Sequence, residues 1–455
     1  MNFQRILIAN RGEIASRVIR SCEALGIETV LGVSQADLDS VPARLADATI
    51  CIGPPQASKS YLDVKKIIQA AISTRVDAIH PGYGFLSENV LLARECLQAG
   101  ISFIGPSEQQ LKGIGDKLQA RKNALEAGLP VVPGGAVDNI DQALDLATEL
   151  SWPILIKAVS GGGGRGMKLV HGPEKLAENM ELAMAEAGAA FGDSRIYLER
   201  FIESGRHVEV QLLGDGENVI HLGDRDCSVQ RRYQKLLEEA PAPDVRHDLR
   251  LAMQKSAVDF GRHLEYCGLG TVEFLLDCDR EKFYFLEMNA RIQVEHPVTE
   301  AITGIDLVAE QIAVAEGRKL RLDQSEISFS GHAIECRINA EDSSRDFLPS
   351  PGTVTLAQFP AGPGIRVDTH IEAGSIVPPY YDSLLAKIII HADDRPAALA
   401  EMRTALRNCR IAGLETNLSM HEQLLNDPEF LRGGVDTAYF TRFTHATLTP
   451  GQRHV

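Results

Sequence analysis

The strongest constraint on the fold is an alternation of strand-like and helix-like segments at the start of the chain. An apolar run begins at Arg5, and the stretch after it carries apolar residues at helical spacing and ends at Gly26. Further apolar runs follow at 28–34, 77–82 and 101–107. Because strands that alternate with helices favour a parallel, doubly wound sheet, we expect this arrangement at the N-terminus.

The pattern changes farther along the chain. Residues 271–277 and 282–289 are predicted to pair as a hairpin. From Gly331, short strands alternate with Gly/Pro turns, which is typical of an antiparallel barrel or sandwich. Two predicted helices follow at about 396–412 and 416–426. The expected fold class is therefore α/β plus β.

Composition excludes several classes of function. The chain has 46 basic and 62 acidic residues and a formal net charge of −16, so we expect no nucleic-acid partner. No uncharged apolar run reaches the roughly 18 residues that a membrane span needs, so we expect no membrane partner. The eight cysteines are scattered and form no CxxC pair, which argues against a zinc site and favours a reducing cytoplasm.

The most informative stretch is FYFLEMNARIQVEHPVTE at 283–300, in which polar residues occupy every second position. The members of this polar row are Glu287, Asn289, Arg291, Gln293 and Glu295. In an extended chain they would share one face. Carboxylate and amide oxygens suit Mg²⁺, which often also holds substrate phosphates, and Glu273 lies in the apolar strand before them. The alternative is an ordinary solvent-exposed strand face.

Two further stretches indicate anion binding. Four consecutive glycines at 161–164 follow Lys157, and their backbone N–H groups could cradle phosphates, although the order is not that of a Walker P-loop. A flexible hairpin turn is the alternative. A basic island in this acidic chain lies within 224–241 and is either an anion site or a solvated face. It consists of Arg225, Arg231, Arg232 and Lys235.

With these stretches together, the chain resembles biotin carboxylase, the ATP-grasp component of biotin-dependent carboxylases, over about 1–445. The strings that carry the resemblance are IANRGEIA, HPGYGFLSEN, IGDK, GGGGRGM, RHVEVQ, DRDCSVQRR, FLEMNARIQVEHPVTE, GHAIECRINAED and VPPYYDSLLAK. The resemblance implies a doubly wound N-terminal domain at 1–113 and a barrel-like antiparallel C-terminal domain at 331–447. Between them it implies an ATP-grasp domain at 114–330, with a mobile lid at about 131–203.

The resemblance also implies the activity. ATP and bicarbonate would carboxylate biotin on a carrier protein through a carboxyphosphate-type intermediate. This would be the first half-reaction of an acyl-CoA carboxylase, such as the acetyl-CoA carboxylase of fatty acid biosynthesis. The cofactors would be ATP and Mg²⁺, with Mn²⁺ as a substitute, and biotin would be a substrate. The expected partners are a separate biotinylated carrier protein, carboxyltransferase subunits and a second copy of the chain in a homodimer.

Site roles follow from the same resemblance. ATP would contact Lys117, Lys157, Gly163, Gly164, Glu199, Ile202, His207 and Tyr233. Mg²⁺ would be held by Glu273, Glu287 and Asn289. Bicarbonate would be held by Lys235, Arg291, Gln293 and the Val294 backbone, with Glu295 as its base. Biotin would lie near Arg337, which would stabilise its enolate, and near Tyr83.

Alternatives stay open for some of these residues. His207 and Gln293 could be packed or surface polar residues, and Tyr83 could be a core residue. The chain departs from the family at Tyr233, where a histidine is usual, and at Arg200, where a lysine is usual. Two rival functions are another ATP-grasp ligase, which would add an amine to an activated carboxylate, and a non-catalytic nucleotide-binding subunit. The motifs RIQVEHPV and ECRINAED argue against the first, and the intact polar row argues against the second.

Overall fold

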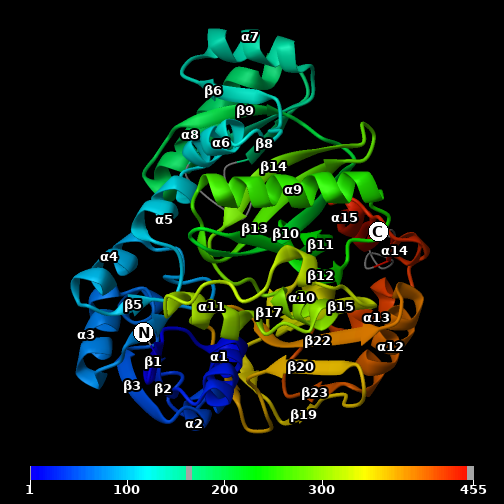
Figure 1. Ribbon diagram of the computed structural model, residues 1–455. Coiled ribbons are helices and arrows are strands. Elements are labelled where there is room, and N and C mark those ends of the chain that lie inside the picture. The colour runs from blue at the N-terminus through cyan, green and yellow to red at the C-terminus, as the bar shows by residue number, and fades with distance from the viewer. Residues whose placement is uncertain (1, 160–166, 448–455) are drawn as a thin grey trace.

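The computed structural model describes residues 2–159 and 167–447, and a five-stranded parallel sheet forms its N-terminal part (Figure 1). The sheet order is β3-β2-β1-β4-β5, so the strand order reverses beside β1, as a doubly wound sheet requires. Its strands are β1 (Arg5–Ile8), β2 (Glu28–Ser34), β3 (Ala48–Gly53), β4 (Ala78–His80) and β5 (Ser102–Phe103). The connecting helices are α1 (Gly12–Leu25), α2 (Val41–Leu45), α3 (Val64–Thr74) and α4 (Val90–Gln98). The predicted N-terminal arrangement is confirmed.

A smaller four-stranded antiparallel sheet lies at the top of the molecule in Figure 1. Its order is β6 (Gly134–Val137), β9 (Ile196–Arg200), β7 (Ile154–Ala158), β8 (Met167–Val170). Helices α7 (Ile140–Leu150) and α8 (Leu176–Phe191) pack on it, and α5 (Glu108–Gly115) and α6 (Lys117–Glu126) lead into it. The predicted phosphate-binding glycines Gly163 and Gly164 lie outside the described residues.

The central element is an eight-stranded sheet in which every neighbouring pair is antiparallel. In sheet order its strands are β14 (Lys282–Asn289), β13 (Cys267–Asp277), β10 (Gly205–Asp215), β11 (Val219–Arg231), β12 (Gln234–Ala240), β15 (His332–Asn339), β22 (Leu384–Ala392) and β20 (Ile365–Thr369). Helices α9 (His247–His263), α10 (His296–Thr303) and α11 (Leu307–Ala315) pack against it. The predicted hairpin of β13 and β14 is confirmed.

The strands after Gly331 are antiparallel, as predicted, but β15, β22 and β20 extend the central sheet instead of closing on themselves. One edge of β12 pairs with β11, and the backbone N–H and C=O groups of its other edge need partners. β15 supplies these partners, although it lies beyond the predicted domain boundary near 330. The predicted closing helices correspond to α12 (Arg395–Asn408) and α13 (Leu418–Leu424), and α14 (Pro428–Arg432) and α15 (Tyr439–Thr447) follow. The short strands are β16 (Glu341–Asp342), β17 (Leu348–Pro349), β18 (Gly352–Thr353), β19 (Leu356–Gln358), β21 (Ile376–Val377) and β23 (Arg410–Ala412).

The N-terminal and central parts share a hydrophobic core. One buried cluster joins Ile6 and Ile14 of the N-terminal part to Leu222 and Leu269 of the eight-stranded sheet and to Leu307 of α11. This shared core brings loops of the N-terminal part next to the functional strands. Among the described helices, none combines the length and the apolar character that crossing a bilayer requires.

Candidate active site

The polar row predicted at 287–295 is not a single extended strand. β14 ends at Asn289, and Glu295 is the residue that precedes α10, so the expected common strand face is wrong. Two local features bend the chain. The Ala290 N–H donates to the Glu88 carboxylate at 2.8 Å instead of continuing the ladder, and Pro297 in the first turn favours a helix start. The bend brings Glu295 back over the sheet, where it meets side chains of other strands.

Lys235 on β12 is the centre of the site. Its Nζ donates to Glu295 Oε1 and Glu209 Oε2, both at 2.6 Å, and to Glu273 Oε1 at 3.0 Å. Burial lowers the pKa of Lys235, but the surrounding acidic groups outweigh it and raise the pKa well above its ordinary value. A permanently charged ammonium thus gathers carboxylates from β10, β13 and the start of α10.

Glu295 lies between two cations. Besides Lys235, its Oε2 accepts a hydrogen bond from Arg337 Nη2 at 2.9 Å, and the glutamate is only 2% exposed. Burial raises the pKa of Glu295, but Lys235, Arg337 and Arg225 together lower it well below its usual range. The carboxylate is therefore ionised at neutral pH and can accept a proton. The structure places Glu295, Lys235 and Arg337 in contact, and their chemical roles stay predictions.

Arg225 lies at the centre of a buried hydrogen-bond network. The residue was predicted as part of the basic island, but the network was not predicted from the sequence. It is fully buried, and it donates to Glu209 Oε1 and to Gln293 Oε1, each at 2.6 Å. The amide nitrogen of Gln293, Nε2, donates to Glu273 Oε1 at 3.0 Å. Gln293 is thus held in the site at both ends. The signal that could have revealed Glu209 is the alternation of His207, Glu209 and Gln211 in RHVEVQ, which matches the alternation in the polar row.

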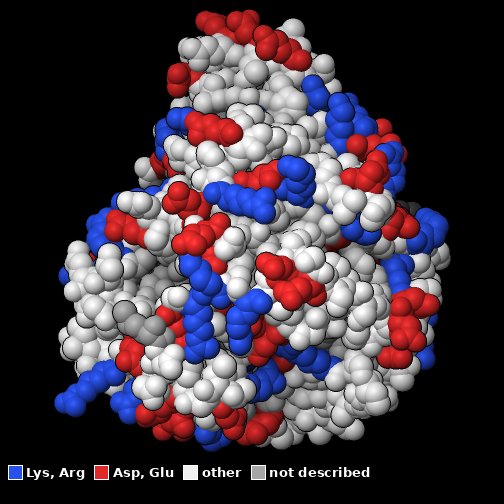
Figure 2. All heavy atoms as spheres, in the orientation of Figure 1, with Lys and Arg blue, Asp and Glu red and all other residues white. Residues whose placement is uncertain are grey.

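The predicted basic island is divided between the site and the surface. Arg225 and Lys235 point into the buried network, whereas Arg231 and Arg232 pair with the exposed Asp346. Basic and acidic side chains are interspersed over the face drawn in Figure 2, without a broad basic area. The cationic groups that could hold a small anion therefore lie in the interior.

Arg291 and Val294 are held by contacts that connect the site to the other parts of the molecule. Arg291 Nε donates to Glu88 Oε2 at 3.1 Å, and Nη2 donates to Asn289 Oδ1 at 2.7 Å. The Val294 carbonyl accepts a hydrogen bond from Lys387 Nζ on β22 at 2.8 Å. The bicarbonate-binding residues expected from the sequence thus surround Glu295, but each already has a protein partner.

The three predicted magnesium ligands also come together. Glu273 and Glu287 are directly opposite each other on β13 and β14, and Asn289 Nδ2 donates to Glu273 Oε1 at 2.7 Å. Burial raises the pKa of Glu287, and the charge of Glu273 raises it further. Facing carboxylates that repel each other are stabilised by a divalent cation between them, and Mg²⁺ takes oxygen ligands. The residues present therefore fit this ion.

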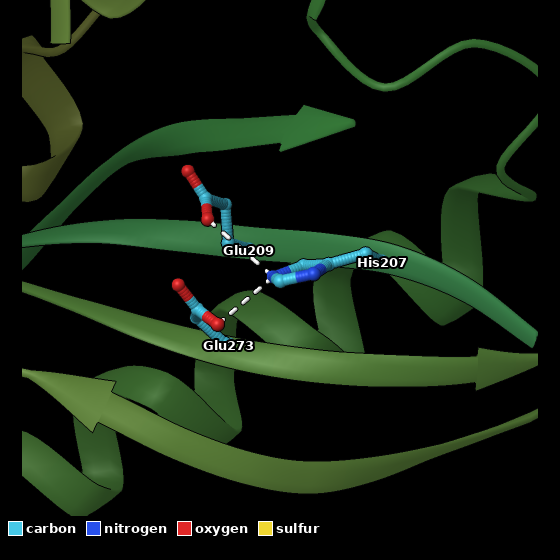
Figure 3. Close-up of side chains that lie close together, drawn as sticks. All are labelled: His207, Glu209 and Glu273. Carbon is cyan, nitrogen blue, oxygen red and sulfur yellow. Dashed lines mark ion pairs between the residues drawn. The ribbon is translucent and has the colours of Figure 1, made fainter. Parts of the chain in front are cut away.

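A second group of possible ligands adjoins the first. Figure 3 shows His207 and Glu209 of β10 with Glu273 of β13, and His207 Nε2 is 3.0 Å from Glu273 Oε2. The ligand atoms of these three side chains lie within 4.8 Å of one another. His207 Nδ1 also meets Gln230 Nε2 at 2.7 Å, so the histidine is held from both sides. Burial lowers the pKa of His207, but the Glu273 charge outweighs this effect and raises it.

The predicted ATP residues of the upper sheet form a second charged group. Lys157 Nζ lies 2.5 Å from Glu199 Oε2 across β7 and β9. Lys117, the first residue of α6, is close enough to respond to their charges, and burial lowers its pKa. Ile202 is buried against Tyr284. Lys157 and Glu199 thus belong to the small sheet, and Ile202 connects it to β14 of the eight-stranded sheet.

Tyr83 and Tyr233 differ in their surroundings. The Tyr83 hydroxyl donates to the buried Glu13 Oε1 at 2.5 Å, beside Lys387. Tyr233 is 59% exposed and shares a two-residue turn with Arg232, and both have positive φ values, as a type I′ turn requires. Arg200, the other departure from the family, donates to the Leu150 carbonyl at 3.2 Å. Contact of Tyr233 with ATP stays a prediction.

Three family models match most of the chain. One described as "Biotin carboxylase, N-terminal domain" matches residues 2–111, and one described as "Biotin carboxylase C-terminal domain" matches 335–442. Between them, "Carbamoyl-phosphate synthase L chain, ATP binding domain" matches 116–323. With the fold and the site described above, these matches define an ATP-dependent ligase of the ATP-grasp class.

Close relatives identify the family within that class. A biotin carboxylase of Nostoc sp. is 50% identical over 442 residues, which cover 96% of this chain and 99% of that protein. Biotin carboxylase 1 of Bacillus subtilis is 46% identical over 443 residues, which cover 97% and 98%. The chain belongs to the biotin carboxylase family.

Solved structures agree with this assignment. The biotin carboxylase of Campylobacter jejuni, solved as a β,γ-ATP complex, has a TM-score of 0.94 and 44% identity, covering 97% of this chain and 99% of that one. The biotin carboxylase domain of Hydrogenobacter thermophilus 2-oxoglutarate carboxylase has a TM-score of 0.93 and 43% identity, with 98% of each chain covered. That domain was solved as a dimer with MgADP, ADP and bicarbonate.

Proposed function

We propose that this chain uses ATP and bicarbonate to carboxylate biotin on a carrier protein, the first half-reaction of a biotin-dependent carboxylase. The observation that carries the proposal is the position of Glu295, an ionised carboxylate between Lys235 and Arg337. A base between two cations can bind a bicarbonate anion and remove its proton. Membership of the biotin carboxylase family, and the bicarbonate bound by the Hydrogenobacter thermophilus domain, support this reading.

In the proposed first step, bicarbonate lies against Lys235, Arg291, Gln293 and the Val294 backbone. Glu295 takes the bicarbonate proton, and the bicarbonate oxygen attacks the γ-phosphorus of ATP, giving carboxyphosphate and ADP. Phosphoryl transfer depends mainly on positioning and charge neutralisation. Lys117 and Lys157 would hold the phosphates, His207 would lie near the ribose or the phosphates, and Glu199 and Ile202 would frame the adenine. When bound to Glu273, Glu287 and Asn289, Mg²⁺ would neutralise further phosphate charge.

Because Lys235 is bound to Glu209, Glu273 and Glu295, substrate must displace some of these contacts. Glu273 is shared between Lys235 and the predicted magnesium ligands, and its contact with Lys235 is the longest of the three at 3.0 Å, so it is the contact that bicarbonate would displace most readily.

In the proposed second step, the bond between the carboxyl carbon and the phosphate oxygen of carboxyphosphate breaks and gives CO₂ and phosphate. The phosphate takes the proton from biotin N1′. The negative charge then develops on the ureido oxygen, where the Arg337 guanidinium stabilises it. Tyr83 would line the biotin site. Nitrogen N1′ finally attacks the carbon of CO₂ and gives carboxybiotin.

The proposed partners are a biotinylated carrier, carboxyltransferase subunits and a second copy of this chain, which the Hydrogenobacter thermophilus dimer supports. The domain limits 1–113, 114–330 and 331–447 belong to the same proposal, as do Mn²⁺ as a substitute metal and a place in fatty acid biosynthesis. A cytoplasmic location is supported by the eight cysteines, all of which are free thiols.

The deciding experiment measures ATP cleavage and carboxybiotin formation by the purified chain with free biotin. Cleavage should require bicarbonate, and carboxybiotin should accumulate with ADP. ATP cleavage that depends on an amine would indicate another ATP-grasp ligase. Nucleotide binding without either product would indicate a non-catalytic subunit. The observation that motivates this second candidate is Tyr233, which stands where a histidine is usual in the family.

A further inference from the structure

Two glutamates behind the site have no assigned role. Glu238 on β12 and Glu335 on β15 are directly opposite each other in the sheet, and each is 0% exposed. Residues in this relation have Cβ atoms about 4.5–5.5 Å apart, so the two carboxyl groups lie side by side. Among the described residues, no donor is aligned for a hydrogen bond to any of their four oxygens. One of the four, Glu238 Oε1, is in ionic contact with Arg337 Nη2. The lack of aligned donors for the other buried oxygens, in the described part of the chain, requires a physical explanation.

The surroundings of the pair exclude water. Two positions farther along, on the same face of the two strands, the opposite pair is Ala240 and Ala333, which belong to a buried apolar cluster with Val298 and Ile302 of α10. In such a place one carboxylate can be balanced by one cation, but a second negative charge has no compensation.

Charged and titratable groups face the pair from several elements. They are Cys227 on β11, Lys235 on β12, Arg337 on β15, Lys387 on β22 and Glu295 at the start of α10. Only Arg337 is in ionic contact, with Nη2 at 2.5 Å from Glu238 Oε1. The same Nη2 lies 2.9 Å from Glu295 Oε2, so Arg337 is held between Glu238 behind it and Glu295 in front.

We propose that Glu238 and Glu335 share one proton and together position Arg337, with Glu238 ionised against the guanidinium and Glu335 neutral. In agreement, burial raises the pKa of Glu335 well above its usual range. Burial also raises the pKa of Glu238, to about 7, but the charge of Arg337 opposes this effect and favours the ionised form at Glu238. The proton gives the pair one negative charge, which one guanidinium can balance.

The pair matters because the partner in front of Arg337 changes its charge. When Glu295 takes the bicarbonate proton, it no longer attracts Arg337, and Glu238 becomes the anion that keeps the guanidinium in place. If both glutamates were ionised, the second negative charge would offset the positive charge of the Arg337 guanidinium, which the ureido oxygen needs for its stabilisation. This inference rests on the proposed role of Arg337 in the biotin half-reaction.

The test compares Glu238→Gln with Glu239→Gln. Glu239 is the next residue on β12, is also buried, and is bound by Arg395 and His332 away from Arg337. Glu238→Gln should lower the ratio of carboxybiotin to ADP, up to about 10²-fold, because a misplaced catalytic group costs rate. It should lower kcat more than it raises the KM for biotin. Glu239→Gln should leave the ratio unchanged. Equal ratios in the two variants would overturn the positioning role.

A second measurement tests the shared proton without relying on activity. The infrared difference spectrum of wild type minus Glu335→Gln at pH 7 should contain the C=O band of a protonated carboxyl. Only carboxylate bands in that difference would overturn the proposal, even if Glu238→Gln does not fold. Glutamine resembles the neutral acid, so Glu335→Gln should change the product ratio less than Glu238→Gln does. A wild type that makes no carboxybiotin would contradict the proposed function, whereas the infrared result would still decide the shared proton.

Discussion

Lys235 and Tyr233 are two residues apart on one hairpin, yet their environments are opposite. Lys235 is 12% exposed in its side chain and binds three carboxylates, whereas Tyr233 is 59% exposed at the tip of the turn. Water can replace a lost contact at the tip, but it cannot do so in the interior. The buried centre should therefore respond strongly to substitution, and the rim should respond weakly.

The largest effect is expected for Glu295→Gln. Gln cannot accept the bicarbonate proton, so bicarbonate-dependent ATP cleavage should fall by roughly 10²–10⁴-fold while ATP still binds. Turnover at saturating bicarbonate and ATP affinity are the measurements. Glu281→Gln, which removes an exposed carboxylate paired with Arg246, is the control and should be fully active. Near-wild-type turnover of Glu295→Gln would contradict its role as the base.

Lys235→Met tests the stability of the centre. Removing one partner of a buried ionic network leaves uncompensated charges, and the free energy of unfolding should fall by about 3–5 kcal/mol. The matched control is Arg232→Met on the same hairpin, whose exposed ion pair with Asp346 should contribute less than about 1 kcal/mol. Denaturant unfolding of both variants compares the two sites directly. Equal losses would show that the buried centre is no more sensitive than the rim.

Arg337→Ala should separate the two half-reactions. Removing a group that stabilises developing negative charge costs about 10²–10³-fold, and here the loss should fall on carboxybiotin formation. ATP cleavage without biotin should be reduced less, because Lys235 still holds Glu295 when its contact with Arg337 is lost, and the predicted magnesium ligands are unchanged. The ratio of carboxybiotin to ADP is the decisive quantity, and an unchanged ratio would remove Arg337 from the biotin step.

The smallest effect is expected for Tyr233→His. A charged imidazole could add a bond to ATP worth about 1.5–3 kcal/mol, against about 0.5–1.5 kcal/mol for a neutral donor, so the gain is near fivefold in affinity. The KM for ATP should fall, more at about pH 6.5 than at about pH 8.5, where imidazole is neutral, and kcat should stay within a few-fold. Equal, pH-independent KM values would mean that Tyr233 does not touch ATP. An inactive wild type revived by this substitution would favour the non-catalytic subunit.

Local patterns predicted the elements well because they depend on nearby residues. The helix at 12–25 ends at Gly26, which adopts the left-handed conformation with φ 70°, and β13 and β14 pair as the predicted hairpin. The polar row is the informative exception. Its spacing was visible in the sequence, but the hydrogen bond of Ala290 to Glu88 comes from a residue about two hundred positions earlier and bends the row out of the strand.

By itself, the sequence determined the strand and helix alternation and the residue types that the chemistry requires: oxygen ligands, a base and cations in recognisable motifs. The tertiary structure alone decided which charges meet. Arg225 and Glu209 stand in motifs of their own, but nothing in the sequence places them at Glu295, and nothing marks Glu238. Sheet pairing brings Arg225 and Glu209 into the network around Glu295, and it places Glu238 against Arg337. The physical reason is that strand register acts between distant segments, whereas periodicity acts within one. Ionisation depends on that register as well, because burial, neighbouring charges and hydrogen bonds determine which carboxyl keeps its proton.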